Sequence, residues 1–198
     1  VPFQWVEMSA ENENPVESND VRVGVDVASS GGDEMAIAVA TGWSVKIVHT
    51  SSGKGNDNAT DVSGKILDYI LEAEKQALEL GSEKRVSVKI DSIGVGWGVA
   101  SLLETWGNEG RHNSIIVRVN VGERAQDASR FVNKRAEFWW NLRMLVQPNS
   151  AGQQDIRLEV DRKTMAQLSA PTFTTDSSGR VVVEKKSDMR RRGVPSPD

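Results

Sequence analysis

Residues 21–50 constrain the fold most, because they hold apolar runs of strand length that are separated by short turn signals. The runs cover residues 21–29, 34–41 and 44–50, with glycines in both connections. Apolar runs of this length between glycine turns predict β-strands joined by tight hairpins. The sequence therefore predicts an antiparallel meander at the start of a sheet.

The rest of the chain alternates helical and strand patterns. Asp57 or Asn58 is placed to cap a helix that Gly81 ends, and a helix is also predicted over 127–146, with Phe131, Phe138, Leu142 and Leu145 on one face. Further elements are predicted as strands at 85–91 and 114–121, a helix at 97–107 and a hairpin within 173–186. These patterns predict the α/β class, with a mixed sheet and helices on its faces.

Composition excludes several kinds of site. The chain has no cysteine and only two histidines, so disulfides, thiolate sites and a histidine-built zinc site are excluded, and any metal must bind to oxygen. No apolar run approaches the roughly 18 residues of a membrane span, and the first residues lack a signal-peptide pattern. We therefore expect a cytosolic protein that is neither secreted nor bound to a membrane.

Asp26 stands inside the first apolar run, and Asp91 ends the strand "RVSVKID". A buried carboxylate needs a partner, and two carboxylates at one sheet edge need a shared proton or divalent cations between them. Oxygen ligands alone select Mg²⁺ or Mn²⁺, and a pair of such ions is suited to phosphodiester cleavage. The alternative for each residue is a turn former or, for Asp91, a cap on the following helix.

The stretch "DSIGVGWGVASLL" places glycines between a strand and a helix. Its spacing is G-x-G-x-G, and Asn120 stands where a dinucleotide site has an acid, so a tight turn with close helix packing explains it equally well. The segment "SSGKG" lacks the earlier glycine of a phosphate-binding P-loop. The chain therefore encodes no ATPase motor, although a nucleotide-binding role for the glycine turn stays open.

In order along the chain, "VGVDVASSGGDEMAIAVATG", "KIDSIGVGWGVASLL", "FVNKRAEFWWNLR" and "EKKSDMRRRGVPSPD" resemble the C-terminal nuclease domain of the phage terminase large subunit. The resemblance implies an RNase H-like fold, in which three antiparallel strands are followed by parallel ones. It also implies a linker at 1–20 after an ATPase domain of the same full-length chain, and a nuclease domain at 21–198. The implied activity is a metal-dependent DNA endonuclease that cuts concatemeric viral DNA during packaging.

The resemblance implies three catalytic and metal-binding acids, Asp26, Asp91 and Asp198, which hold two Mg²⁺ or Mn²⁺ ions. In the family pattern another aspartate follows three residues after the position of Asp198, and this sequence ends before it. Contacts to the phosphate backbone are expected from basic side chains of the helix and the tail: Lys134, Arg135, Lys185, Lys186, Arg190, Arg191 and Arg192. A solvated helix face is the alternative for the charges near Lys134.

The partners implied are double-stranded DNA, the portal protein and the small terminase subunit, in the cytoplasm of an infected bacterial cell. The net charge of -4 does not oppose DNA binding, because basic residues are enriched in the second half of the chain. The alternatives are a cellular resolvase or ribonuclease H-like nuclease of the same fold, and a non-catalytic docking module of a packaging motor.

Overall fold

The computed structural model describes residues 1–27, 34–52 and 58–194, which divide into two compact units. The sheet unit is Val16–Asn120, and the terminal unit combines Val1–Pro15 with the described residues from Val121 to Val194. None of the helices in the described ranges is both long and apolar enough to cross a bilayer.

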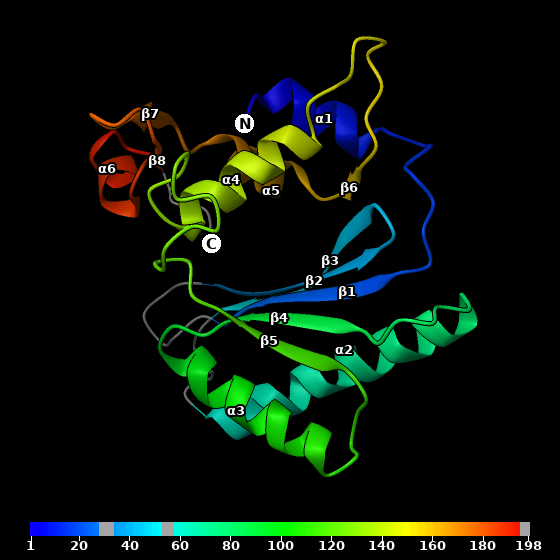
Figure 1. Cartoon of the computed structure of the whole chain (residues 1–198). Helices are drawn as coiled ribbons and strands as arrows, with labels where there is room; N and C mark the ends of the chain where they lie inside the picture. Colours follow the sequence, from blue (N-terminus) through cyan, green and yellow to red (C-terminus); the bar gives the residue numbers. More distant parts are fainter. Residues whose placement is uncertain (28–33, 53–57, 195–198) are drawn as a thin grey trace. The chain divides into compact units, whose positions relative to one another are not determined.

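The sheet unit is built on a mixed sheet (Figure 1). Its strands are β1 (Val21–Asp26), β2 (Glu34–Thr41), β3 (Ser44–Ser52), β4 (Ser87–Asp91) and β5 (Ile115–Val119), and they lie side by side in the order β5-β4-β1-β2-β3. The pairs β1–β2 and β2–β3 are antiparallel, while β1–β4 and β4–β5 are parallel. The predicted α/β class and the predicted change from antiparallel to parallel pairing are both confirmed.

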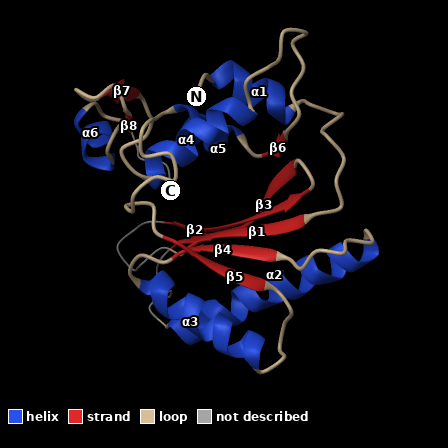
Figure 2. Ribbon diagram, viewed as in Figure 1, coloured by secondary structure: helices blue, strands red, loops and turns tan. Residues whose placement is uncertain are grey.

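Helices α2 (Ala59–Glu79) and α3 (Val95–Asn108) cover one face of this sheet (Figure 2). The side chain of Asn58 caps α2 by accepting a hydrogen bond from the Thr60 N–H at 2.9 Å, and the chain leaves this helix through Gly81 at φ +67°. The helix predicted at 97–107 begins two residues earlier, at Val95.

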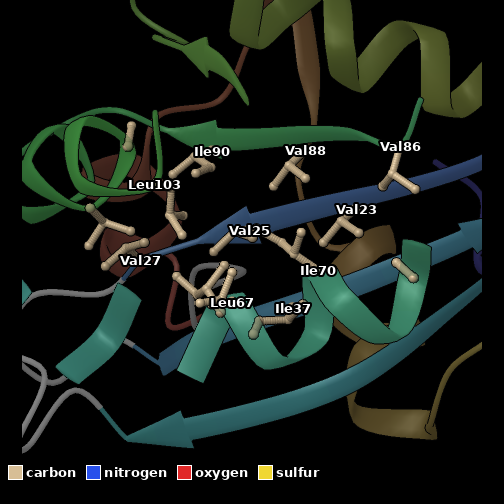
Figure 3. Packing of buried hydrophobic residues seen from close by; sticks show 14 of the residues in the cluster. Val23, Val25, Val27, Ile37, Leu67, Ile70, Val86, Val88, Ile90 and Leu103 are labelled. Carbon is tan, nitrogen blue, oxygen red and sulfur yellow. The ribbon is translucent and has the colours of Figure 1, made fainter. Parts of the chain in front are cut away.

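The core of the sheet unit lies between the sheet and these two helices (Figure 3). Along β1, Val21, Val23 and Val25 are buried and alternate with more exposed residues, as a strand with one covered face requires. Val88 and Ile90 continue the buried layer on β4. Each such side chain contributes about 1.5–3 kcal/mol when fully buried, so the alternation fixes which face of β1 and β4 meets the helices.

The terminal unit contains short elements from both ends of the chain. They are α1 (Phe3–Ala10), α4 (Lys134–Leu145), β6 (Arg157–Glu159), α5 (Arg162–Ser169), β7 (Phe173–Thr175), β8 (Val181–Val183) and α6 (Lys186–Arg191). Helix α1 contacts α5 and β6, and the buried Ser9 hydroxyl donates to the Ile156 carbonyl at 3.0 Å. Strands β7 and β8 form the predicted hairpin. The expected linker therefore includes a packed helix, whereas the ATPase domain before it stays a prediction.

The helix predicted over 127–146 begins only at Lys134. Asn133 ends the preceding loop and caps α4, because its side chain accepts a hydrogen bond from the Ala136 N–H at 2.9 Å. The buried Glu137 carboxylate accepts the backbone N–H groups of Gln126 and Asp127 at 2.8 and 3.0 Å, which holds the loop back against the helix. The predicted amphipathic face is wrong, since Phe131 lies before α4 and Phe138 is exposed.

Candidate active site

Asp26 and Asp91 end neighbouring parallel strands. The ladder between β1 and β4 ends at the pair Val25–Ile90, and each aspartate is the next residue on its strand. In a parallel pair, residues at the same level point to the same face, and adjacent strands are about 4.8 Å apart. The fold therefore brings the two predicted acids to one edge and one face of the sheet.

This carboxylate face is opposite to the buried core. Val25 and Ile90 point toward the helices, so Asp26 and Asp91 point away from them; Asp26 is exposed and Asp91 is partly exposed. Ala36 is the β2 residue paired with Asp26, so β2 places no bulky side chain opposite the carboxylate. A carboxylate in this position does not carry the desolvation penalty of a core residue, which explains how β1 accommodates Asp26.

Lys89 adds positive charge to the same face. It precedes Asp91 by two residues, so the two side chains share a face, and it is paired in register with Gly24 of β1. Its side chain is exposed, and within the described ranges it forms no ion pair or hydrogen bond. The alternation of "VSVKID" carried this signal, but sequence reasoning missed it.

The turn after β4 fixes the position of Asp91. Its Oδ1 accepts the Ile93 N–H at 3.1 Å, and the N–H and hydroxyl of Ser92 both donate to the Val119 carbonyl, at 2.8 and 3.1 Å. Gly94 begins α3 at φ +62° without a side-chain cap. Asp91 is therefore not the N-cap of α3. One of its carboxylate oxygens stabilises the turn instead, as the turn-former alternative predicts.

Gly96 explains why this turn is rich in glycine. A Cβ atom at this position would be 1.9 Å from the Asp91 carbonyl oxygen and 3.8 Å from the Cβ of Val27. Only glycine lets the first turn of α3 approach the ends of β4 and β1 this closely. The tight-turn interpretation of these glycines therefore has a direct structural basis.

The donor set at this edge suits a hard divalent cation. Asp26 and Asp91 offer carboxylate oxygens, which Mg²⁺ and Mn²⁺ prefer, and no thiolate or imidazole competes in the sequence next to them. Within the described ranges no group of three or more histidine, cysteine or acidic side chains could hold a metal. The predicted third acid, Asp198, lies outside the described residues.

The basic residues predicted to bind DNA all belong to the terminal unit. On α4, the Lys134 ammonium pairs with the Glu123 carboxylate at 2.6 Å. The half-buried Arg135 guanidinium donates to the Glu184 carbonyl at 2.6 Å, and burial lowers the pKa of Arg135. Both side chains therefore hold neighbouring parts of the terminal unit together.

The basic residues on and next to α6 are of two kinds. Lys185, Lys186 and Arg190 are exposed, and Arg191 pairs with Asp188 at 3.2 Å while 81% of its side chain stays accessible. Arg192 instead binds both carboxylate oxygens of Glu184, at 2.7 and 2.8 Å, and the Ala170 carbonyl at 2.6 Å.

The Glu184 carboxylate accepts hydrogen bonds from two separate segments of the terminal unit. Its carboxylate also accepts the N–H and hydroxyl of Thr172, at 3.2 and 2.9 Å. The hydrogen bonds from Arg192, followed by those from Thr172, lower the pKa of Glu184 to about 2. Arg192 therefore connects α6 to the β7–β8 hairpin.

The chain is similar to known proteins in its structure, whereas comparisons of its sequence find no match. The chain matches no protein-family model and no curated protein. It is similar to a mutant nuclease domain of the large terminase subunit gp2 of bacterial virus Sf6 with manganese and beta-thujaplicinol, with a TM-score of 0.65 and 17% identity over 100% of this chain and 93% of that chain.

It is also similar to the large terminase nuclease from thermophilic phage G20c, with a TM-score of 0.51 and 14% identity over 86% of this chain and 75% of that chain. A structure of the same G20c nuclease with bound cobalt has a TM-score of 0.50 and 14% identity, covering 92% of this chain and 86% of that chain. The chain therefore has the RNase H-like fold of the nuclease domains of phage large terminase subunits.

Proposed function

We propose that the chain is the nuclease domain of a phage large terminase subunit, a metal-dependent DNA endonuclease that cuts concatemeric viral DNA during genome packaging. The observation that carries the proposal is the shared level and shared face of Asp26 and Asp91 at the carboxyl ends of two parallel strands. The fold shared with terminase nucleases supports it, and so does the manganese or cobalt in two of those structures.

Asp26, Asp91 and a C-terminal acid, Asp198 or an aspartate after it, would hold two Mg²⁺ or Mn²⁺ ions. When bound, these ions would supply an activated water as the nucleophile and stabilise the 3′-oxygen of the leaving group. The backbone N–H of Ile93 orients the Asp91 carboxylate, and Ser92 anchors the turn behind it. Hydrolysis leaves a 5′-phosphate and a 3′-hydroxyl.

The rest of the chain would position DNA. Lys89 is placed on the carboxylate face to meet a backbone phosphate, and the exposed cations Lys185, Lys186, Arg190 and Arg191 would bind the backbone without reading bases. Lys134, Arg135 and Arg192 would contribute mainly by shaping the terminal unit. The ATPase domain, portal protein and small subunit are the proposed partners, in the host cytoplasm.

The test is nicking of supercoiled plasmid in Mn²⁺ or Mg²⁺. Asp26→Asn and Asp91→Asn keep the side-chain volume but remove the charge that would bind the cations, so both should abolish nicking while the circular dichroism spectrum is unchanged. Asp20→Asn is the matched control, because Asp20 precedes β1 at the opposite end and pairs with Lys84 at 2.7 Å. It should cut like wild type.

Full activity of either Asn variant at Asp26 or Asp91 would remove that residue from the mechanism. Four-way junctions and RNA/DNA hybrids in the same assay distinguish the other nucleases of this fold. A strong preference for either substrate would contradict the packaging role while leaving the nuclease site intact.

A further inference from the structure

Gly24 is an interior residue of β1, the strand that carries Asp26. It stands between Val23 and Val25, whose side chains are buried on the face covered by the helices, so Gly24 belongs to the opposite face (Figure 3). An interior glycine weakens a strand, because it has no side chain to pack and loses more conformational freedom on folding than other residues do. Its presence in the middle of the sheet therefore needs an explanation.

Three features of a fold can require a glycine in a strand: a bulge, a positive φ, or a neighbouring atom too close for a Cβ. Both ladders of β1 run through Gly24 without a change of register, pairing it with Ala38 of β2 and Lys89 of β4. The φ angle of Gly24 is not positive. Apart from its chain neighbours, no described residue has an atom within 4 Å of a Cβ built at Gly24. None of the three features explains this glycine.

Gly24 lies beside the carboxylate pair. It precedes Asp26 by two residues, and its partner Lys89 precedes Asp91 by two residues, so all four positions are on the carboxylate face. Two residues of a strand span about 6.6 Å, and neighbouring strands are about 4.8 Å apart. One strand of a DNA duplex rises about 3.4 Å per nucleotide. A DNA strand that continues from the two acids along β1 therefore reaches the level of Gly24 within about two nucleotides.

The surroundings of Gly24 suit a sugar–phosphate backbone. On one side is Lys89, whose exposed ammonium group forms no ion pair or hydrogen bond with the described part of the chain, so it is available to a phosphate. On the other side, Ala38 offers only a methyl group. A strand glycine with no reason inside the fold is typical of a place where a ligand approaches the backbone closely.

We infer that Gly24 is the position at which the backbone of the DNA strand being cut approaches β1 most closely, with a phosphate of that strand on Lys89. The inference rests on the proposed function. A side chain at this position would stand between the DNA strand and the sheet, and it would hold the neighbouring phosphates away from Asp26 and Asp91. Gly24 thus weakens β1 but leaves the approach to the two acids open.

The experiment introduces side chains of increasing size, Gly24→Ala and Gly24→Val, and measures Tm and the kinetics of plasmid nicking in Mn²⁺. A Cβ atom meets no obstacle at Gly24, so neither variant should be less stable than wild type, and Gly24→Ala should raise Tm by about 1–4 °C. A misplacement of about 1 Å can lower a rate about 100-fold. Gly24→Val should therefore lower kcat/KM by about this factor, and Gly24→Ala by a smaller one.

Mn²⁺ affinity separates a blocked path for DNA from a disturbed pair of acids. Isothermal titration calorimetry should give the wild-type Mn²⁺ affinity for both Gly24 variants, because the added side chain leaves Asp26 and Asp91 in place. Lys89→Met should raise KM in the wild-type background but add little to Gly24→Val, since the DNA strand then no longer reaches the ammonium group.

Gly64→Ala is the matched control. Gly64 is an interior glycine of α2, and a Cβ atom there would likewise have no described atom within 4 Å beyond its chain neighbours and the backbone of its own helix. Alanine at this position should raise Tm by a similar amount. It should leave nicking unchanged, because α2 covers the face of the sheet opposite to the two acids.

Four results would overturn the inference: wild-type kcat/KM in Gly24→Val, a lower Tm of Gly24→Ala, weaker Mn²⁺ binding by the Gly24 variants, or an equal loss of nicking in Gly64→Ala. Fully additive effects of Lys89→Met and Gly24→Val would also contradict a shared path of the DNA strand. The proposed nuclease function fails by a different result, namely full nicking activity of the Asn variants at Asp26 and Asp91. The two failures are therefore distinguishable.

Discussion

Gly96 and the Asp91 carbonyl are in a contact that excludes every side chain, because a Cβ atom at Gly96 would be 1.9 Å from the Asp91 oxygen. The contact connects the first turn of α3 to the end of the strand that presents one of the two proposed acids. A displacement of α3 would therefore move Asp91 relative to Asp26.

Gly96→Ala should consequently impair both folding and nicking. The added methyl group forces the helix or the end of β4 to shift, and overpacking of this kind costs about 1–3 kcal/mol of unfolding free energy. Urea denaturation followed by circular dichroism measures the loss of stability, and plasmid nicking at a temperature where the variant is fully folded measures the effect on the site.

Gly98→Ala is the control for that experiment, two residues farther along the same helix. A Cβ atom at Gly98 would be 3.6 Å from the Cβ of Ala59, an ordinary van der Waals contact. Alanine inside a helix is about 0.5–1 kcal/mol more favourable than glycine, so this variant should be as stable as wild type or more stable. Equal stability of the two variants would contradict the contact inferred for Gly96.

The sequence predicted the meeting of Asp26 and Asp91 only on the condition that their strands are neighbours in the sheet, which periodicity does not decide. Each residue stands at a strand end, and a parallel pairing of those strands brings the ends together. The closeness of Gly96 to the Asp91 carbonyl was not predictable, since it depends on how α3 packs against β4. The apolar pattern also wrongly predicted a helix at residues 127–133. There the cap formed by Asn133 and the backbone N–H groups that donate to the Glu137 carboxylate favour a loop.

The roles of the basic residues show the same limit. Arg190, Arg191 and Arg192 are identical and consecutive in the sequence, so composition predicts the same role for all of them. Their positions on and after α6 decide otherwise, because only Arg192 reaches the Glu184 carboxylate. Which arginine is available to a phosphate is therefore a property of the fold.

The bond between Glu184 and Arg192 predicts a pH dependence of stability. The pKa of Glu184 falls from 4.5 to about 2 in the folded chain, so the folded state favours the carboxylate. A carboxyl group whose pKa is lower in the folded state stabilises that state. The full stabilisation is present at pH values above the pKa of the unfolded chain, and it is lost as the pH falls from 4.5 toward 2. Glu184→Gln should therefore lower Tm most above pH 4.5, and its Tm should converge with that of wild type at lower pH.

Differential scanning fluorimetry between pH 7 and pH 3 follows this convergence. Arg192→Gln removes the other partner of the same bond, so its pH profile should resemble that of Glu184→Gln. A constant difference in Tm between wild type and Glu184→Gln across this range would mean that Glu184 does not titrate as its hydrogen bonds imply.

The exposed arginines of α6 predict a change in the salt dependence of DNA binding. Arg190 and Arg191 are accessible to phosphates, whereas Arg192 is engaged by Glu184. Each phosphate contact contributes about 0.9 to the slope of log affinity against log salt concentration, so Arg190→Ala and Arg191→Ala should each reduce that slope by about this amount.

The slope is measured from the fluorescence anisotropy of a labelled duplex between about 50 and 200 mM salt. Over this range, added salt strongly weakens binding that depends on phosphate contacts. Arg192→Ala is the matched control from the same run of arginines. It should lower Tm, because Glu184 loses its partner, and leave the slope unchanged. Arg191→Ala should have little effect on Tm, because the exposed pair with Asp188 contributes about 0–1 kcal/mol. Equal slopes for wild type, Arg190→Ala and Arg191→Ala would exclude α6 from the DNA-binding surface.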